Sequence, residues 1–200
     1  MTSIDITCPP GVALLLSDRA HARALESLWA AKTAIPHHLP PGEWTSYGRA
    51  WLTAQTVKVD LLDFLYQVWS LTWGKALNAR FPKARLLSQQ EAEAPNDPFG
   101  WVIYGDTPRP HALYIAVDLP GYGELETAVA LTEEHELTIW FGGLSPAQDL
   151  VAPWTRKEQP NDITDDEDGY FYAHDLAEIS AQGGNLNLAY LAAKAAIEAL

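Results

Sequence analysis

Residues 112–131 read ALYIAVDLPGYGELETAVAL, and the fold class can be inferred outward from this stretch. Two runs rich in aliphatic and β-branched residues, Ala112–Val117 and Leu125–Leu131, stand on either side of the turn-like residues 120–123. Short apolar runs separated by a Pro/Gly turn are typical of antiparallel strands joined by a hairpin. The stretch therefore predicts two neighbouring strands with Pro120-Gly121-Tyr122-Gly123 as the hairpin tip.

Two more runs of the same character lie nearby, Trp101–Tyr104 and Leu137–Phe141. Turn-like residues at 105–108 and 133–135 separate them from the central pair. This spacing leaves no room for helices between the strands, so it favours an antiparallel meander of four strands over strand–helix–strand units.

The sequence before the strands has helical character. Ser17 is a suitable N-cap for an Ala-rich helix that should stop before Pro36. Residues 45–80 predict a long helix, with a break near Thr53–Val57, that Pro82 ends. Its second half is apolar apart from a narrow polar stripe, so we expect it to be central in a core or to pack on another chain. The polar stripe consists of Asp60, Asp63, Gln67, Ser70, Gly74 and Asn78.

The sequence after the strands is less uniform. A helix is expected to follow Pro146, with Trp154 packing near its end, and residues 170–181 could form a strand or a helix. Residues 186–200 predict a terminal helix because of their alanine content and spacing, with Asn185 as its N-cap.

Together these patterns predict an α+β fold with N-terminal helices, a central four-stranded antiparallel meander, and C-terminal helices packed on one sheet face. We expect a single domain over residues 1–200. Its helical part would span about 1–85, the sheet about 99–142, and an acidic loop with terminal helices about 145–200.

The charge of the chain is distributed unevenly. Residues 1–116 hold ten acids and ten Lys/Arg, whereas residues 117–200 hold sixteen acids and three basic residues, so the second part carries the whole net charge of −13. A field of this sign repels nucleic acid and anionic membranes and attracts basic protein surfaces. We therefore expect a basic protein partner, such as a toxin or a nucleic-acid-binding protein, and no direct contact with nucleic acid or membrane.

The acidic charge is densest just before an aromatic run. Carboxylates that steer a basic partner, next to aromatic anchors, are a recognised arrangement in protein interfaces. The competing interpretation is a solvated loop whose aromatic residues complete the core. The candidate partner-binding residues are Glu158, Asp162, Asp165, Asp166, Glu167, Asp168, Tyr170 and Tyr172.

Catalytic and metal-binding patterns are weak. An EF-hand alignment on Gly169 would place Thr164 at the first position and Asp175 at the last, where a carboxylate and a Glu are required. The sequence has no CxxC, HExxH, GxSxG or P-loop pattern. We thus expect no catalytic residue, metal or cofactor. The alternatives are a small hydrolytic enzyme with a carboxylate/histidine site at His174 and Asp175, or a structural subunit of a larger complex, and self-association is an open prediction.

Cys8 is the only cysteine, so the fold is expected not to rest on disulfides, which fits a cytoplasmic protein. The apolar run at residues 12–16 is too short for a signal peptide. Small size, acidity, eight Trp residues and the missing catalytic motifs make the composition similar to that of bacterial immunity proteins and phage-encoded inhibitors. That resemblance implies a stoichiometric inhibitor or immunity-type protein that acts by binding.

Overall fold

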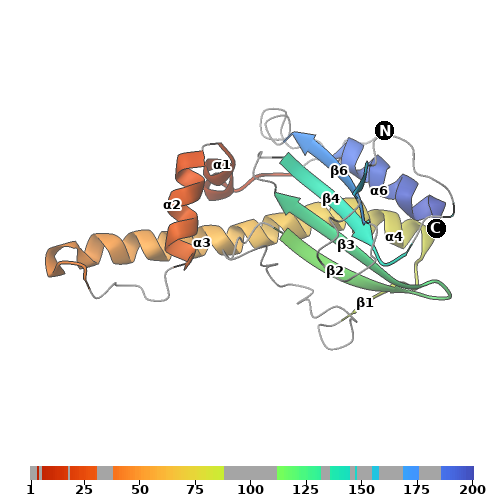
Figure 1. Ribbon diagram of the computed structural model, residues 1–200, viewed down its shortest axis with the longest axis horizontal. Helices are drawn as coiled ribbons and strands as arrows, with labels where there is room; N and C mark the ends of the chain where they lie inside the picture. Colours follow the sequence, from red (N-terminus) through yellow and green to blue (C-terminus); the bar gives the residue numbers. More distant parts are fainter. Residues whose placement is uncertain are drawn as a thin grey trace.

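Figure 1 shows the computed structural model of the chain. The structure describes residues 4, 6–17, 19–30, 38–87, 112–131, 136–144, 147, 155–157, 169–175 and 186–200. The helices are α1 (Pro10–Ser17), α2 (Arg19–Ala30), η1 (Pro41–Glu43), α3 (Trp44–Trp69), η2 (Ser70–Gly74), α4 (Lys75–Arg80) and α6 (Asn187–Ala199). The strands are β1 (Arg85–Leu86), β2 (Ala112–Leu119), β3 (Gly123–Leu131), β4 (Glu136–Gly142), β5 (Thr155–Lys157) and β6 (Gly169–Asp175).

All of these strands form one antiparallel sheet in the order β1-β2-β3-β4-β6-β5. β2, β3 and β4 follow one another as a meander, so the predicted α+β class with an antiparallel meander is confirmed. The sheet is wider than expected, because β6 and β5 continue it beyond β4 and β1 adds a short edge next to β2. The run Trp101–Tyr104, predicted as the first strand, lies outside the described residues.

The β2–β3 hairpin turns where the sequence predicted. Leu119 pairs with Gly123, and the backbone N–H of Tyr122 donates to the carbonyl of Leu119 over 2.9 Å. Gly121 and Gly123 have φ angles of 87° and 107°, which residues with a Cβ rarely adopt. The ring of Tyr122 packs edge-on against Phe81, with ring centroids 5.1 Å apart, so the hairpin tip is held against the end of α4.

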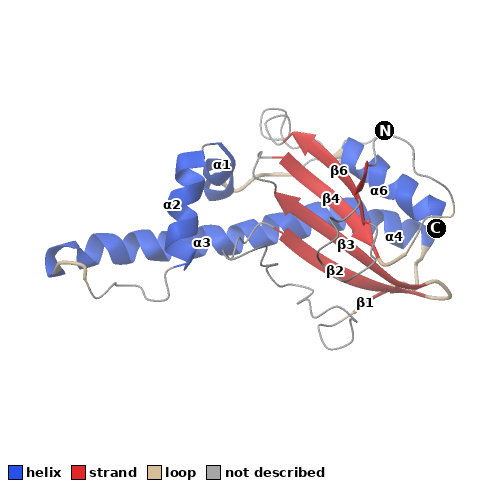
Figure 2. Ribbon diagram, viewed as in Figure 1, coloured by secondary structure: helices blue, strands red, loops and turns tan. Residues whose placement is uncertain are grey.

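Helices cover one face of the sheet, as expected (Figure 2). Side chains of β2, β3 and β4 alternate, so every second residue points at this helical layer. The second half of α3, together with η2, α4 and α6, supplies the opposing side, and Ala-rich α6 lies close beside α4 and η2. The large apolar strand residues buried on this side are Leu113, Ile115, Val117, Leu119, Leu125, Val129, Leu137, Ile139 and Phe141.

Two tryptophans fasten the helical layer to the sheet. The indole N–H of Trp69 donates to the hydroxyl of Thr127 over 2.8 Å, and that hydroxyl donates to the carbonyl of Ile115, also over 2.8 Å. The indole N–H of Trp73 donates to the carbonyl of Ala128 over 3.2 Å. Both rings are therefore buried with their one polar atom satisfied, which removes the main cost of burying an indole.

The long helix is interrupted at a different place from the one predicted. Residues 53–57 are continuous α-helix, and the hydroxyls of Thr53 and Thr56 donate to carbonyls one turn back. The irregularity is the π-helical turn η2, which directly follows Trp69 and contains Trp73. There the hydroxyl of Thr72 donates to the carbonyl of Val68 over 2.7 Å, which supplies a donor where the helical ladder is loosened.

The N-terminal region contains one helix more than expected. Ser17 is the last residue of α1 and not the N-cap of the next helix, so that assignment was wrong. Pro10 begins α1, and a proline is tolerated at a first helical position because its missing N–H has no partner there. α2 is where the Ala-rich pattern placed it, and it ends before Pro36.

Several remaining predictions can be followed only in part. Residues 169–175 form a strand, which settles the choice between strand and helix for that segment, and α6 matches the predicted terminal helix. The helix expected after Pro146 lies outside the described residues. The N-cap of α6 is Leu186, so the assignment of Asn185 as the N-cap was wrong. β5 was not anticipated.

Replacing Thr127 with Val should destabilise the protein by about 1–3 kcal/mol, because it leaves the buried Trp69 indole without an acceptor. The matched control is Thr138→Val, which removes a buried hydroxyl that has no hydrogen-bond partner among the described residues, so it should leave the stability unchanged or raise it. Urea unfolding measures both. Equal losses of unfolding free energy at positions 127 and 138 would contradict a stabilising hydrogen bond between Trp69 and Thr127. Full additivity of Thr127→Val with Trp69→Phe would contradict it as well.

Candidate protein-binding surface

The predicted acidic run is bracketed by a strand pair at the edge of the sheet. Residues 158–168 lie outside the described part of the chain, so Glu158, Asp162 and the four acids 165–168 are not placed individually. Their neighbours are placed: Lys157 of β5 pairs directly with Gly169 of β6. The chain therefore leaves the sheet and returns to it at one point, where the acidic connection begins and ends.

Three further carboxylates lie at this same end of the sheet. Asp118 at the end of β2 pairs directly with Glu124 at the start of β3, and Glu126 pairs with Gly142 at the end of β4. Gly142 follows Phe141, whose partner on β6 is the residue next to Gly169. We call Asp118, Glu124, Glu126 and the connection 158–168 the acidic end.

Sequence reasoning did not single out these three strand carboxylates. A signal was present, because Asp118, Glu124 and Glu126 alternate with the apolar residues of the hairpin and so belong to the sheet face opposite the helices. Their proximity to the acidic connection depends on β6 pairing with β4, which no local pattern predicts.

Among the described residues, Asp118 has both a like charge and an opposite charge as cross-strand neighbours. Like charges directly across a strand pair are destabilising, and Asp118 faces Glu124. On its other side Asp118 pairs with Arg85, and their guanidinium and carboxylate groups are 3.8 Å apart. Both side chains are about half exposed, so this ion pair is weakened by solvent.

The two tyrosines of the prediction are placed through the backbone of β6. Tyr170 pairs with Phe141, and Tyr172 pairs with Ile139. Both partners are buried against the helices, so the register is also compatible with the competing interpretation in which this aromatic segment completes the core. The partner-binding role of Tyr170 and Tyr172 stays a prediction.

The residues of the alternative hydrolytic site lie at the opposite end of β6. His174 pairs with Leu137, and Asp175 pairs with Glu136. Among the described residues, no group of three or more His, Cys, Asp or Glu side chains could hold a metal ion. Within the same residues, no helix is both long and apolar enough to cross a membrane.

Cys8 precedes α1 and packs partly against the core. Its thiol contacts the carbonyl of Pro9, 3.7 Å away, and burial raises the pKa of the thiol above its ordinary value. Because the thiolate is the nucleophilic form, this environment does not activate Cys8 at neutral pH.

Comparison with known proteins gives no relative: no family model matches the chain, and no curated protein or solved structure is significantly similar to it.

The raised pKa of Cys8 predicts slow thiol chemistry. A disulfide reagent such as dithiobis-nitrobenzoate should react with the native protein at pH 8 at least several-fold more slowly than with free cysteine. The folded state favours the neutral thiol, so the raised pKa of Cys8 adds to the free energy of unfolding. This contribution is fully present below the unfolded pKa of about 8.5 and is lost as the pH rises through the pKa of the folded state. Urea-unfolded protein is the control; equal rates in the two states would contradict the prediction.

Proposed function

We propose that this protein is a non-catalytic binding protein of the inhibitor or immunity type, which engages a basic surface of a protein partner through the acidic end. The observation that supports the proposal is that Asp118, Glu124 and Glu126 lie at the same end of the sheet as Lys157 and Gly169, the residues on either side of the acidic connection. Residues far apart in sequence therefore add to a single negative field.

Such a field acts before contact is made. At physiological salt, charges influence each other over a Debye length of about 8 Å, so neighbouring carboxylates on one surface act together on an approaching partner. Electrostatic complementarity of this kind raises the association rate more than it lowers the dissociation rate. A nuclease toxin or a nucleic-acid-binding protein presents the basic surface that fits this field, whereas nucleic acid itself is repelled.

The proposal predicts binding that depends on salt and on position. The test uses surface plasmon resonance with purified basic nucleases and DNA-binding proteins, beginning with any encoded beside this chain. The triple variant Asp118→Asn, Glu124→Gln, Glu126→Gln should lower the association rate about tenfold and leave the dissociation rate almost unchanged. Neutralising the four acids 165–168 with Asn and Gln should have a similar effect.

The matched control removes one charge elsewhere: Glu43→Gln neutralises an acid on η1, away from the acidic end, and its counterpart within the acidic end is the single variant Asp118→Asn. This control should associate at close to the wild-type rate. Affinity that does not weaken between low and high salt would refute an electrostatic interface, and equal slowing by Glu43→Gln and Asp118→Asn would refute its location.

A further inference from the structure

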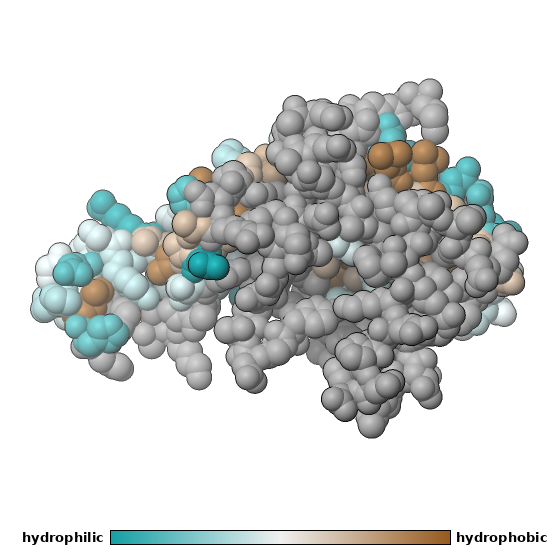
Figure 3. Space-filling view, turned by 45° about the horizontal axis from the view of Figure 1, so that its top comes forward, coloured by the Kyte–Doolittle hydropathy of each residue, from teal (hydrophilic) through white to brown (hydrophobic). Residues whose placement is uncertain are grey.

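The first half of α3 projects from the sheet, as Figure 1 shows. A largely apolar row runs along the outer side of α3 from this half into the second half. The row follows the i, i+3, i+4 spacing of one helix face. Its members are Trp44, Gly48, Leu52, Gln55, Val59, Leu62 and Tyr66. Leu52 is 61% exposed and Val59 is 59% exposed, which is unusual for aliphatic side chains that lie one above the other. In Figure 3, hydrophobic side chains appear among hydrophilic ones on this projecting part.

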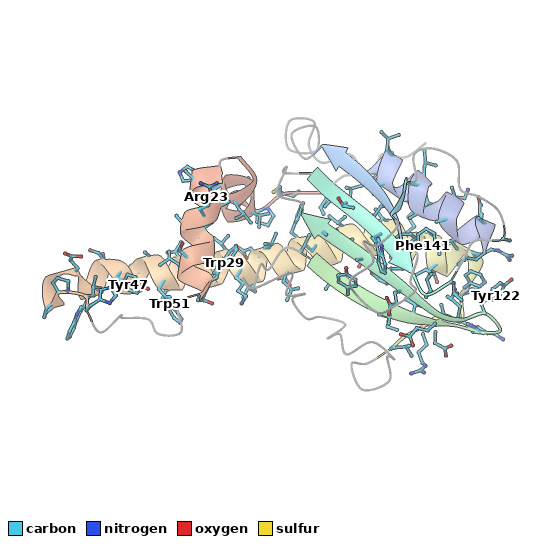
Figure 4. All side chains as sticks on the ribbon, viewed as in Figure 1. Arg23, Trp29, Tyr47, Trp51, Tyr122 and Phe141 are labelled. Atoms are coloured by element: carbon cyan, nitrogen blue, oxygen red, sulfur yellow. The ribbon has the colours of Figure 1, made fainter. Side chains whose placement is uncertain are left out.

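Among the described residues, the exposed members Leu52 and Val59 point away from the helices that α3 packs against, whereas Leu62 packs partly against the core and Tyr66 stacks with Trp69. Ala54, Val57 and Leu61 form the buried side of the helix, roughly opposite Leu52 and Val59 on the helical wheel. α1 and α2 cover that buried side: the indole N–H of Trp29 donates to the carbonyl of Ala54 over 2.5 Å. Figure 4 labels Trp29 where α2 meets α3. The outer row therefore contributes nothing to the core near α1 and α2.

The outer row is self-complementary when two copies run antiparallel about Gln55. Gln55 then faces Gln55 of the second copy, and Trp44 lies opposite Tyr66 of the second copy. Leu52 lies within one residue of the level of Val59 of the second copy. Gly48 lies opposite Leu62, and nothing in the chain occupies the space within 4 Å of where a Cβ of Gly48 would point. A small residue facing a large one permits close helix packing.

The charges beside the row favour the same arrangement. On the polar flank, Arg49 lies in the first half of α3, and Asp60 and Asp63 lie in the second half. Antiparallel pairing about Gln55 brings Arg49 to the level of Asp60 and Asp63 of the second copy, twice by symmetry. Parallel pairing would set each group against its own kind, which is unfavourable.

We propose that α3 binds a second copy of this chain, antiparallel, through the row from Trp44 to Tyr66. In this arrangement the first half of each α3 packs against the second half of the other copy's α3. The same surface is thus used by both copies, which is the isologous interface that two-fold dimers require. It differs from the expectation that the apolar segment 59–77 itself packs on another chain, since the large side chains after Val59 are mostly buried inside the protein. The dimer does not depend on the acidic end, so the two proposals can fail separately.

Cysteine cross-linking tests the register. In a Cys8→Ser background, Gln55→Cys should form a disulfide-linked dimer under mild oxidation, because the two positions face each other. The control is Gln67→Cys, at an exposed position of the same helix, which the proposed register places about 36 Å from its own copy. Selective linkage at position 55 supports the proposal; equal linkage, or none at position 55, overturns it.

Charge reversal tests the pairing. Sedimentation of the full chain should show a dimer whose dissociation constant rises about tenfold in Arg49→Glu and returns towards the wild-type value when Asp60→Arg and Asp63→Arg are added. Val59→Lys should give a monomer with an unchanged thermal midpoint, since Val59 is outside the core. A wild-type monomer at about 100 μM, including one that binds a different protein through this row, would overturn the proposal.

Discussion

The hydroxyl of Thr127 lies between two parts of the protein that are far apart in sequence, accepting from the indole of Trp69 and donating to the carbonyl of Ile115. One turn further on, Trp73 donates to the carbonyl of Ala128 and packs edge-on against Phe141, with ring centroids 5.8 Å apart. These contacts fix how α3 and η2 lie across β2, β3 and β4. A buried indole without an acceptor would be costly, so other positions of the helix across the strands are disfavoured.

The position of this anchor determines which surfaces remain available. Trp69 is the last residue of a helix of 26 residues, about 39 Å long, so fixing its C-terminal end leaves the N-terminal half beyond the edge of the sheet. α1 and α2 cover one side of that half, and its other side stays exposed. At the opposite end of the molecule, Tyr122 and Phe81 hold the β2–β3 hairpin against the end of α4. The carboxylates of the hairpin then lie on the face opposite the helices.

Local patterns were sufficient to predict the antiparallel hairpin, because the alternation on both sides of Pro120-Gly121-Tyr122-Gly123 has period two. They were also sufficient for the terminal helix. They failed for η2, because a π-turn is set by where Trp69 and Trp73 must meet the sheet and not by local propensity. The pairing of β6 with β4 is a long-range choice of the same kind. It brings Asp118, Glu124 and Glu126 into one group with the acidic connection, so sequence reasoning recognised the charge asymmetry but only one part of the surface.

The two proposed surfaces have a geometric relation that neither implies alone. The hairpin carboxylates lie on the sheet face opposite the helices, whereas the outer row of α3 lies on the helical side and extends from the projecting half into the second half (Figure 1). A bound copy would therefore not cover these carboxylates. In an antiparallel dimer the two acidic ends would face outward at opposite extremes of the assembly. A partner with two basic surfaces could then engage both only if their spacing matched, since avidity requires simultaneous contact. Dimerisation would thus select among basic partners by the distance between their surfaces, in addition to their charge.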